Sequence, residues 1–282
     1  MPETQSLPIN PLRRYVRPGL LPTIFCMGCG GGTVLNAFCR AVDELSIDPH
    51  DMVMVTGIGC SSWIPSPYFL ADTLHTTHGR AIAFATGVRM MSPDRKVVVI
   101  AGDGDLSGIG GNHLIHAARR NIGLTVIMVN NSIYGMTGGQ VAPTTPEGVT
   151  TTTTPHGNIE PPFDVSSLVA AAGASYVARW TTYQVVDLVK SFKEALAHPG
   201  FAFVEVVAQC TTSYGKAVGK KNAADFLQDY KARSVRVAKA ATMAPEQLDG
   251  KIVVGTLKNV VKPEYSARLR AQVAGLCSPS RA

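Results

Sequence analysis

Short apolar segments alternate with amphipathic segments along most of this chain. Runs rich in Val, Ile and Met predict strands, and apolar side chains at every third or fourth position predict helices. The predicted strands are 52–55, 96–101, 124–129, 175–178 and 201–207, and the predicted helices are 33–45, 79–90, 109–120, 165–172 and 183–197. Strands that alternate with helices in this way indicate an α/β fold, a parallel sheet with helices on both faces.

The pattern divides the chain into three parts. Residues 1–25 carry five prolines and no clear period, so they predict an extended arm. Residues 26–210 form the α/β domain, with Thr33 as the expected N-cap of its first helix and a Gly- and Pro-containing loop at 130–162. Residues 211–282 form an extension in which we expect a helix over 223–240 and no strand.

The net charge of +6 is unevenly distributed. Residues 1–210 hold 13 Lys and Arg against 15 Asp and Glu, whereas residues 211–282 hold 13 against 5. This basic extension forms either a solvated face or a docking site for an acidic redox partner. It lacks the motifs and interleaved aromatics of a nucleic-acid-binding segment, so no nucleic-acid partner is expected.

No membrane association is expected either. The longest purely apolar runs, such as 97–101, are far shorter than the ~20 residues that span a bilayer. No signal peptide is evident, because no basic segment followed by an apolar one opens the chain. We therefore expect a cytoplasmic protein.

Two polar motifs follow neighbouring predicted strands. Strand 96–101 leads into Gly102-Asp103-Gly104-Asp105, and the next strand leads into Asn130-Asn131. Parallel strands of a βαβ unit place such loops side by side at one edge of the sheet. Asp103 and Asn131 offer oxygen ligands for Mg²⁺, and the glycines flanking Asp103 allow close approach to a diphosphate.

The cysteines suggest a metal or redox centre. Cys26 and Cys29 form a CxxC motif, and Cys60 and Cys210 follow the first and last predicted strands. Four thiolates suit either Zn²⁺ or a [4Fe–4S] cluster. Ligands from three distant segments favour the cluster, because structural zinc usually comes as two local pairs. Cys39 is expected in the core, and Cys277 lies in a Pro- and Ser-containing tail.

These motifs together resemble the β subunit of 2-oxoacid:ferredoxin oxidoreductases over roughly residues 20–215. The resemblance rests on Cys26-Met-Gly-Cys29-Gly, Gly57-Ile-Gly-Cys60-Ser, His78-Gly-Arg80, Gly102-Asp-Gly-Asp105, Gly111-Asn-His-Leu-Ile-His116, Asn130-Asn131 and Tyr134-Gly-Met-Thr-Gly-Gly-Gln140. GDG followed after about 25 residues by NN also resembles the fingerprint of thiamine diphosphate-binding folds.

The resemblance implies a role for each motif. Mg²⁺ would be coordinated by the side chains of Asp103 and Asn131 and by the backbone carbonyl of Ile133. The residues that would contact thiamine diphosphate are Ile58, Gly59, Cys60, Ser61, His78, Gly102, Gly104, Asp105, Gly135 and Met136. The [4Fe–4S] cluster would be held by Cys26, Cys29, Cys60 and Cys210. No residue of this chain is assigned as a catalytic acid or base.

The same resemblance implies the reaction and its partners. Such an enzyme oxidatively decarboxylates a 2-oxoacid, transfers the acyl group to coenzyme A and passes electrons through the cluster to ferredoxin or a redox partner subunit. The segment 157–164 resembles members that oxidise 2-oxoglutarate. Trp63 and Gly138 stand where some relatives carry lysines, so those positions transfer no substrate preference. The glutamate that activates thiamine is expected on an α subunit that completes the site.

Two alternatives stay open from the residues. A non-redox thiamine-dependent 2-oxoacid decarboxylase subunit would need no cluster. If the chain were a non-catalytic zinc or electron-transfer subunit, the occurrence of GDG and NN at this spacing would be accidental. Metal content separates the three, because they predict iron with sulfide, no metal at the cysteines, or zinc.

Overall fold

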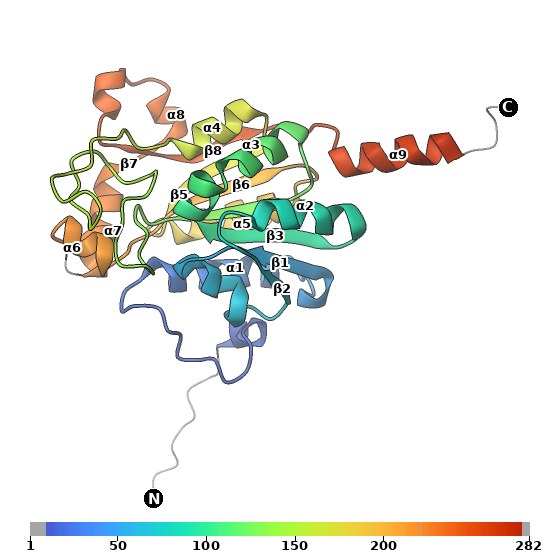
Figure 1. Ribbon diagram of the computed structural model, residues 1–282, viewed down its shortest axis with the longest axis horizontal. Coiled ribbons are helices and arrows are strands. Elements are labelled where there is room, and N and C mark those ends of the chain that lie inside the picture. Colours follow the sequence, from blue (N-terminus) through green and yellow to red (C-terminus); the bar gives the residue numbers. More distant parts are fainter. Residues whose placement is uncertain (1–9, 221, 278–282) are drawn as a thin grey trace, which may run out of the picture.

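The computed structural model describes residues 10–220 and 222–277, which build one sheet with helices on both faces (Figure 1). The strand order is β2-β1-β3-β4-β6-β5-β8-β7. The strands are β1 (Met52–Thr56), β2 (Asp72–His75), β3 (Lys96–Gly102), β4 (Thr125–Asn130), β5 (Tyr176–Thr181), β6 (Ala202–Val207), β7 (Ser234–Arg236) and β8 (Ile252–Asn259). Every pair from β2 to β5 is parallel, and β8 is antiparallel to β5. The predicted α/β class with a parallel sheet is confirmed.

Two apolar cores lie on the two faces of the sheet. Successive side chains of a strand point to opposite faces, so Val98 and Ile100 join one core while Val97 and Val99 join the other. The first core is covered by α1 (Gly30–Glu44) and α5 (Val185–Ala197), and the second by α2 (Ala81–Met91), α3 (Gly111–Arg120) and α4 (Val165–Ala172). Both faces of β3 are therefore buried, as its continuous apolar sequence predicts.

The C-terminal part adds short elements around this domain. They are α6 (Ser213–Ala217), α7 (Ala223–Arg233), α8 (Val237–Ala240) and α9 (Tyr265–Cys277), and α9 points away from the body of the molecule (Figure 1). Among the helices that the structure describes, none combines the length and apolar character that crossing a bilayer requires. The division of the chain into arm, domain and extension stays a prediction.

The extension differs from its predicted secondary structure. The expected helix over 223–240 forms at 223–233 and 237–240 but is not continuous, because β7 interrupts it and pairs in parallel with residues 252–254 of β8. The expectation of no strand is wrong for the same reason. Most side chains of β8 are only partly buried and mix Thr and Lys with Val, which obscures the alternation that marks a strand. β2 was also missed, since three of its four residues are exposed.

The first helix begins earlier than predicted. Its N-cap is Cys29 rather than Thr33, and the Cys29 Sγ accepts a hydrogen bond from Gly31 N–H. Two of the three glycines in the first turn, Gly30 and Gly31, have other groups packed closely against them. A Cβ on Gly30 would lie 2.7 Å from the Ala208 side chain, and Gly30 N–H donates to the Gln209 carbonyl at 2.9 Å. This packing ties the CxxC loop to the end of β6.

Candidate cofactor site

One cavity of about 240 Å³ lies where β1, β3 and β4 end. All the residues predicted for thiamine diphosphate and Mg²⁺ line it: Ile58, Gly59, Cys60, Ser61, His78, Gly102, Asp103, Gly104, Asp105, Asn131, Ile133, Gly135 and Met136. Tyr134 and Thr137 line it as well and were not predicted. The motifs, which are spread over residues 58–136, therefore converge on one pocket, while their individual roles stay predictions.

The register between β3 and β4 brings the two polar motifs together. Gly102 pairs with Val129 in the parallel ladder, so both loops leave the sheet at the same level. Ser132 N–H then donates to Asp103 Oδ2 at 3.1 Å, and the Thr144 hydroxyl donates to the same oxygen. Burial raises the pKa of Asp103 to about 6, because its charged form loses contact with water. A bound divalent cation would favour the charged form.

The Asp105 carboxylate forms hydrogen bonds to two further loops at this edge of the sheet. Its side chain is buried, and Oδ1 accepts hydrogen bonds from Gly79 N–H at 2.7 Å and Ile58 N–H at 3.2 Å. The same oxygen lies 2.5 Å from His78 Nδ1. A Cβ on Gly57 would lie 2.0 Å from Asp105 Oδ2, so only glycine fits there. The Asp105 carboxylate therefore fixes where Ile58 and His78 enter the cavity.

The cavity has the donor and acceptor chemistry of a metal–diphosphate site. Within the described ranges, Asp105 Oδ2 is buried with no hydrogen-bond partner. A Cβ on Gly104 would lie 2.2 Å from the Tyr134 ring, whose hydroxyl donates to the Gly104 carbonyl at 3.0 Å. The Tyr134 ring thus packs against Gly104 and leaves no room for a larger residue there. These residues fit Mg²⁺ with a diphosphate, since the glycines leave backbone groups accessible and the buried carboxylates need a cationic neighbour.

Loop-to-loop hydrogen bonds bring the CxxC motif to the end of β6. The Gln209 side chain donates to the Gly28 carbonyl at 3.0 Å, and the Thr211 hydroxyl donates to the Met27 carbonyl at 2.7 Å. The Thr212 hydroxyl lies within hydrogen-bonding range of two sulfurs, 3.8 Å from Cys26 Sγ and 3.6 Å from Cys210 Sγ. Cysteines that are more than 180 residues apart in sequence therefore lie at one place.

Cys60 completes this cluster of thiols next to the cavity. A Cβ on Gly135 would lie 3.7 Å from Cys60 Sγ and 3.8 Å from Cys210 Sγ, so these sulfurs flank the wall of the cavity. Burial, together with the neighbouring thiols of Cys29, Cys210 and Cys26, raises the pKa of Cys60 to about 11. Thiols this hard to ionise are stabilised as thiolates by a bound cationic centre.

The four candidate thiols lie close to one another. Within the part of the chain that the structure describes, no three or more His, Cys, Asp or Glu side chains are placed to hold one metal ion. The thiols of Cys26, Cys29, Cys60 and Cys210 nevertheless interact electrostatically, which shows their proximity. Cys39 is buried in the first core, as expected, and takes no part.

Comparison with known proteins decides the family. Residues 57–206 match the thiamine pyrophosphate enzyme, C-terminal TPP binding domain. The 2-oxoglutarate synthase subunit KorB of Methanocaldococcus jannaschii is 52% identical over 96% of this chain and 100% of its own length. The 2-oxoacid:ferredoxin oxidoreductase subunit beta of Saccharolobus solfataricus is 43% identical over 67% of this chain and 62% of its own length. The chain belongs to the β subunits of 2-oxoacid:ferredoxin oxidoreductases.

A solved structure agrees with this β-subunit family. The chain superposes on the 2-oxoglutarate:ferredoxin oxidoreductase from Magnetococcus marinus, solved with 2-oxoglutarate, coenzyme A and succinyl-CoA bound, with a TM-score of 0.84 and 33% identity. The match covers 99% of this chain and 94% of that chain. The similarity therefore includes the extension as well as the matched thiamine pyrophosphate domain.

Proposed function

We propose that this chain is the cofactor-binding β subunit of a coenzyme A-dependent 2-oxoglutarate:ferredoxin oxidoreductase. The observation that carries the proposal is the convergence of the GDGD, NN and cysteine motifs on one edge of the sheet. The identity to 2-oxoglutarate synthase subunits at about half of all positions supports 2-oxoglutarate as the substrate. The reaction would yield succinyl-CoA and CO₂, with two electrons leaving through the cluster.

The metal and the diphosphate would be held by residues of the GDGD and NN loops. Asp103 and Asn131 would coordinate Mg²⁺ by side-chain oxygens, and Ile133 by its backbone carbonyl. The diphosphate would lie along Gly102, Gly104, Gly135 and Met136, whose backbone lines the cavity. When bound, thiamine diphosphate supplies the nucleophilic carbon and the electron sink for decarboxylation.

The remaining residues of the cavity would orient the cofactor and shield it from water. Ile58, Gly59 and Ser61 line the wall next to Cys60, and Asp105 fixes the loop that carries His78. Cys26, Cys29, Cys60 and Cys210 would hold the [4Fe–4S] cluster. Because Cys60 and Gly135 line the thiamine cavity while touching the thiol site, electrons would have only a short path between the two cofactors.

Several partners follow from this proposal. An α subunit would supply the thiamine-activating glutamate, which no residue lining the cavity of this chain provides in the described ranges. Ferredoxin or a redox subunit would accept the electrons, and coenzyme A would accept the acyl group. The chain would work in the cytoplasm, where reducing conditions keep the thiols free for cluster assembly.

The test is enzymatic and uses the chain coexpressed anaerobically with its α subunit. The purified complex should reduce a low-potential acceptor only when 2-oxoglutarate, coenzyme A and thiamine diphosphate are all present. It should prefer 2-oxoglutarate to pyruvate, and the chain without its partner should be inactive. Decarboxylation without acceptor reduction would instead identify a non-redox decarboxylase, and activity of the isolated chain would refute the need for an α subunit.

A further inference from the structure

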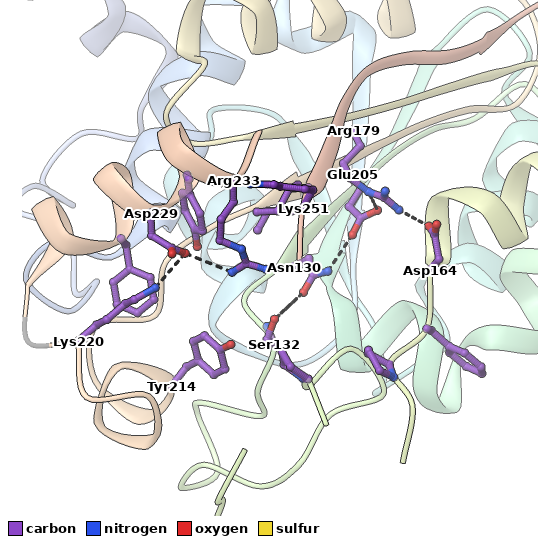
Figure 2. Close-up of a pocket in the computed structure, with 17 residues that line it drawn as sticks. Asn130, Ser132, Asp164, Arg179, Glu205, Tyr214, Lys220, Asp229, Arg233 and Lys251 are labelled. Atoms are coloured by element: carbon purple, nitrogen blue, oxygen red, sulfur yellow. Dashed lines mark hydrogen bonds and ion pairs between the residues drawn. The ribbon is translucent and has the colours of Figure 1, made fainter. Parts of the chain in front are cut away.

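A second cavity, of about 280 Å³, lies behind the turn that carries the proposed metal ligands (Figure 2). The turn is shared, because Asn130 and Ser132 line this second cavity while Asn131 and Ile133 line the thiamine cavity. The other side chains that line the second cavity come from the loop at 146–164, β5, β6 and the C-terminal extension. Residues that never reach the cofactor are thus in contact with the metal-binding turn.

A buried carboxylate connects the sheet to this turn. Glu205, on β6, is buried, and its Oε1 accepts a hydrogen bond from the Asn130 side-chain amide at 2.8 Å. Its Oε2 accepts from Arg179 Nε at 2.8 Å and from the Ser166 hydroxyl at 2.5 Å. Arg179 also pairs with Asp164, the N-cap of α4. Figure 2 shows this series of contacts from Asp164 through Arg179 and Glu205 to Asn130 and Ser132.

The Asn130 side chain also binds the backbone of the turn. With its amide nitrogen held by Glu205, the Asn130 Oδ1 faces Ser132 and accepts from Ser132 N–H at 3.1 Å, a donor that it shares with Asp103 Oδ2. Ser132 has a φ of +60°, a conformation that a non-glycine residue adopts only when its surroundings enforce it. The Thr145 hydroxyl holds the Ser132 carbonyl at 2.7 Å from the other side. This conformation determines where Asn131 and Ile133 point.

We infer that Glu205 is a positioning residue for the divalent metal, acting through Asn130 and balanced by Arg179. The inference rests on the proposed function, since it assigns Asn131 and Ile133 to the metal. The Glu205 carboxylate fixes the orientation of the Asn130 amide, because a carboxylate can accept a hydrogen bond only from the nitrogen end of that amide. The fixed amide then holds Ser132 at positive φ and presents both metal ligands. Buried groups that orient metal ligands commonly affect affinity by about 10–100-fold.

The experiment measures metal affinity directly, in the coexpressed complex after removal of thiamine diphosphate and Mg²⁺. Mn²⁺ is titrated in saturating thiamine diphosphate, and free Mn²⁺ is followed by its room-temperature EPR signal. Glu205→Ala should raise the Mn²⁺ dissociation constant about 10–100-fold, and Glu205→Gln, which can still accept from Asn130, should restore part of the affinity. Iron content and circular dichroism report whether each variant folds.

A matched control lies in the same cavity. Asp229 is also a carboxylate with two cationic partners, Lys220 at 2.9 Å and Arg233 at 3.2 Å, and it makes no hydrogen bond or ion pair to the turn. Asp229→Asn should leave Mn²⁺ affinity unchanged. Asn130→Ala should weaken binding as much as Glu205→Ala, and the double variant should lose no more than the larger single loss, because both act through one bond.

Three results would overturn the inference. Wild-type Mn²⁺ affinity in folded Glu205→Ala would show that Glu205 only fills the core. Additive losses from Glu205→Ala and Asn130→Ala would show that Glu205 does not act through Asn130. No thiamine-dependent Mn²⁺ binding by the wild-type complex would refute the proposed metal site itself, and the role of Glu205 with it.

Discussion

The proposed metal–diphosphate cavity and the site formed by the four thiols lie side by side but are built differently. Loops at the ends of adjacent parallel strands form the cavity, so the register of the sheet brings the loops that carry Asp103 and Asn131 to one edge. The thiol site joins loops from residues 26, 60 and 210, held by contacts such as Gln209 to Gly28. The first site is therefore a consequence of topology, whereas the second depends on individual side-chain hydrogen bonds.

This difference has a physical consequence for stability. Strand pairing in the sheet is supported by two buried cores, so the cavity should persist when a cofactor is removed. The CxxC loop carries an exposed cysteine, Cys26, and Met27 is 95% exposed, so little burial holds that loop in place. Metal ligation would then supply much of the order at the thiol site. Variants should therefore separate the two sites, although the sites adjoin at Cys60 and Gly135.

The largest effect is expected from Cys60→Ala. Loss of this thiol should abolish the stable [4Fe–4S] cluster and acceptor reduction, while Mg²⁺-dependent thiamine diphosphate binding is retained. Iron analysis, low-temperature EPR after dithionite and calorimetry of cofactor binding measure the two sites independently. Cys39→Ala is the matched control, since Cys39 is buried in the core away from the site, and it should keep its iron. A full iron complement in Cys60→Ala would refute its role as a ligand.

Asp103→Asn should have the opposite effect, a loss of thiamine diphosphate affinity with the iron content unchanged. The neutral amide replaces a buried carboxylate at the proposed metal site, so Mg²⁺-dependent thiamine diphosphate affinity should fall about a hundredfold or more. Iron content should stay at the wild-type level, because no cysteine contacts Asp103 through any hydrogen bond or ion pair in the described residues. Calorimetric titration with thiamine diphosphate at fixed Mg²⁺ measures the loss. Unchanged affinity would exclude Asp103 from the metal site.

A smaller loss is expected from Gly57→Ala. Its Cβ would lie 2.0 Å from Asp105 Oδ2, so the loop that carries Ile58 must shift. Such overpacking typically has an energetic effect of about 1–3 kcal/mol, and we expect roughly a tenfold rise in the thiamine diphosphate dissociation constant. Gly87→Ala, where a Cβ meets nothing within 4 Å, is the control and should bind normally. Wild-type affinity for Gly57→Ala would show that Asp105 does not fix this loop.

The smallest effect is expected from Thr211→Val at the thiol site. The substitution removes the hydrogen bond from the Thr211 hydroxyl to the Met27 carbonyl, which is worth about 1 kcal/mol. The cluster should form but should lose iron faster to a chelator, and Thr211→Ser should restore the wild-type rate. Equal chelation rates in Thr211→Val and the wild type would show that this bond does not retain the CxxC loop.

The sequence predicts the residues of the cavity better than it predicts the C-terminal strands and the hydrogen bonds between loops. Apolar strands followed by GDGD and NN specify a sheet edge, because strand direction fixes where their ends meet. β8 and β7 were missed because their partly buried positions carry Thr, Lys and Ser and show no clear period. The arrangement of cysteines was predicted from strand ends and resemblance, whereas the hydrogen bonds of Gln209 and Thr211 that hold it depend on tertiary contacts.

The Glu205 network was also missed, although the sequence carries a signal for it. Glu205 interrupts the apolar run 201–207, and a charged residue at a buried strand position requires a partner. The partner, Arg179, similarly interrupts β5. Each appears alone as an irregularity in an apolar pattern. Only the pairing of β5 with β6, which places Arg179 opposite Glu205, reveals one buried ion pair.

The most direct test of the account is the cofactor content of the wild-type chain, purified anaerobically with its α subunit. We expect about four iron and four sulfide, one thiamine diphosphate and one Mg²⁺ per β subunit, with a reduced-cluster EPR signal after dithionite. Addition of 2-oxoglutarate and coenzyme A should reduce the same cluster. Zinc in place of iron, or a cluster that 2-oxoglutarate does not reduce, would contradict the proposal that the two adjoining sites work as one redox centre.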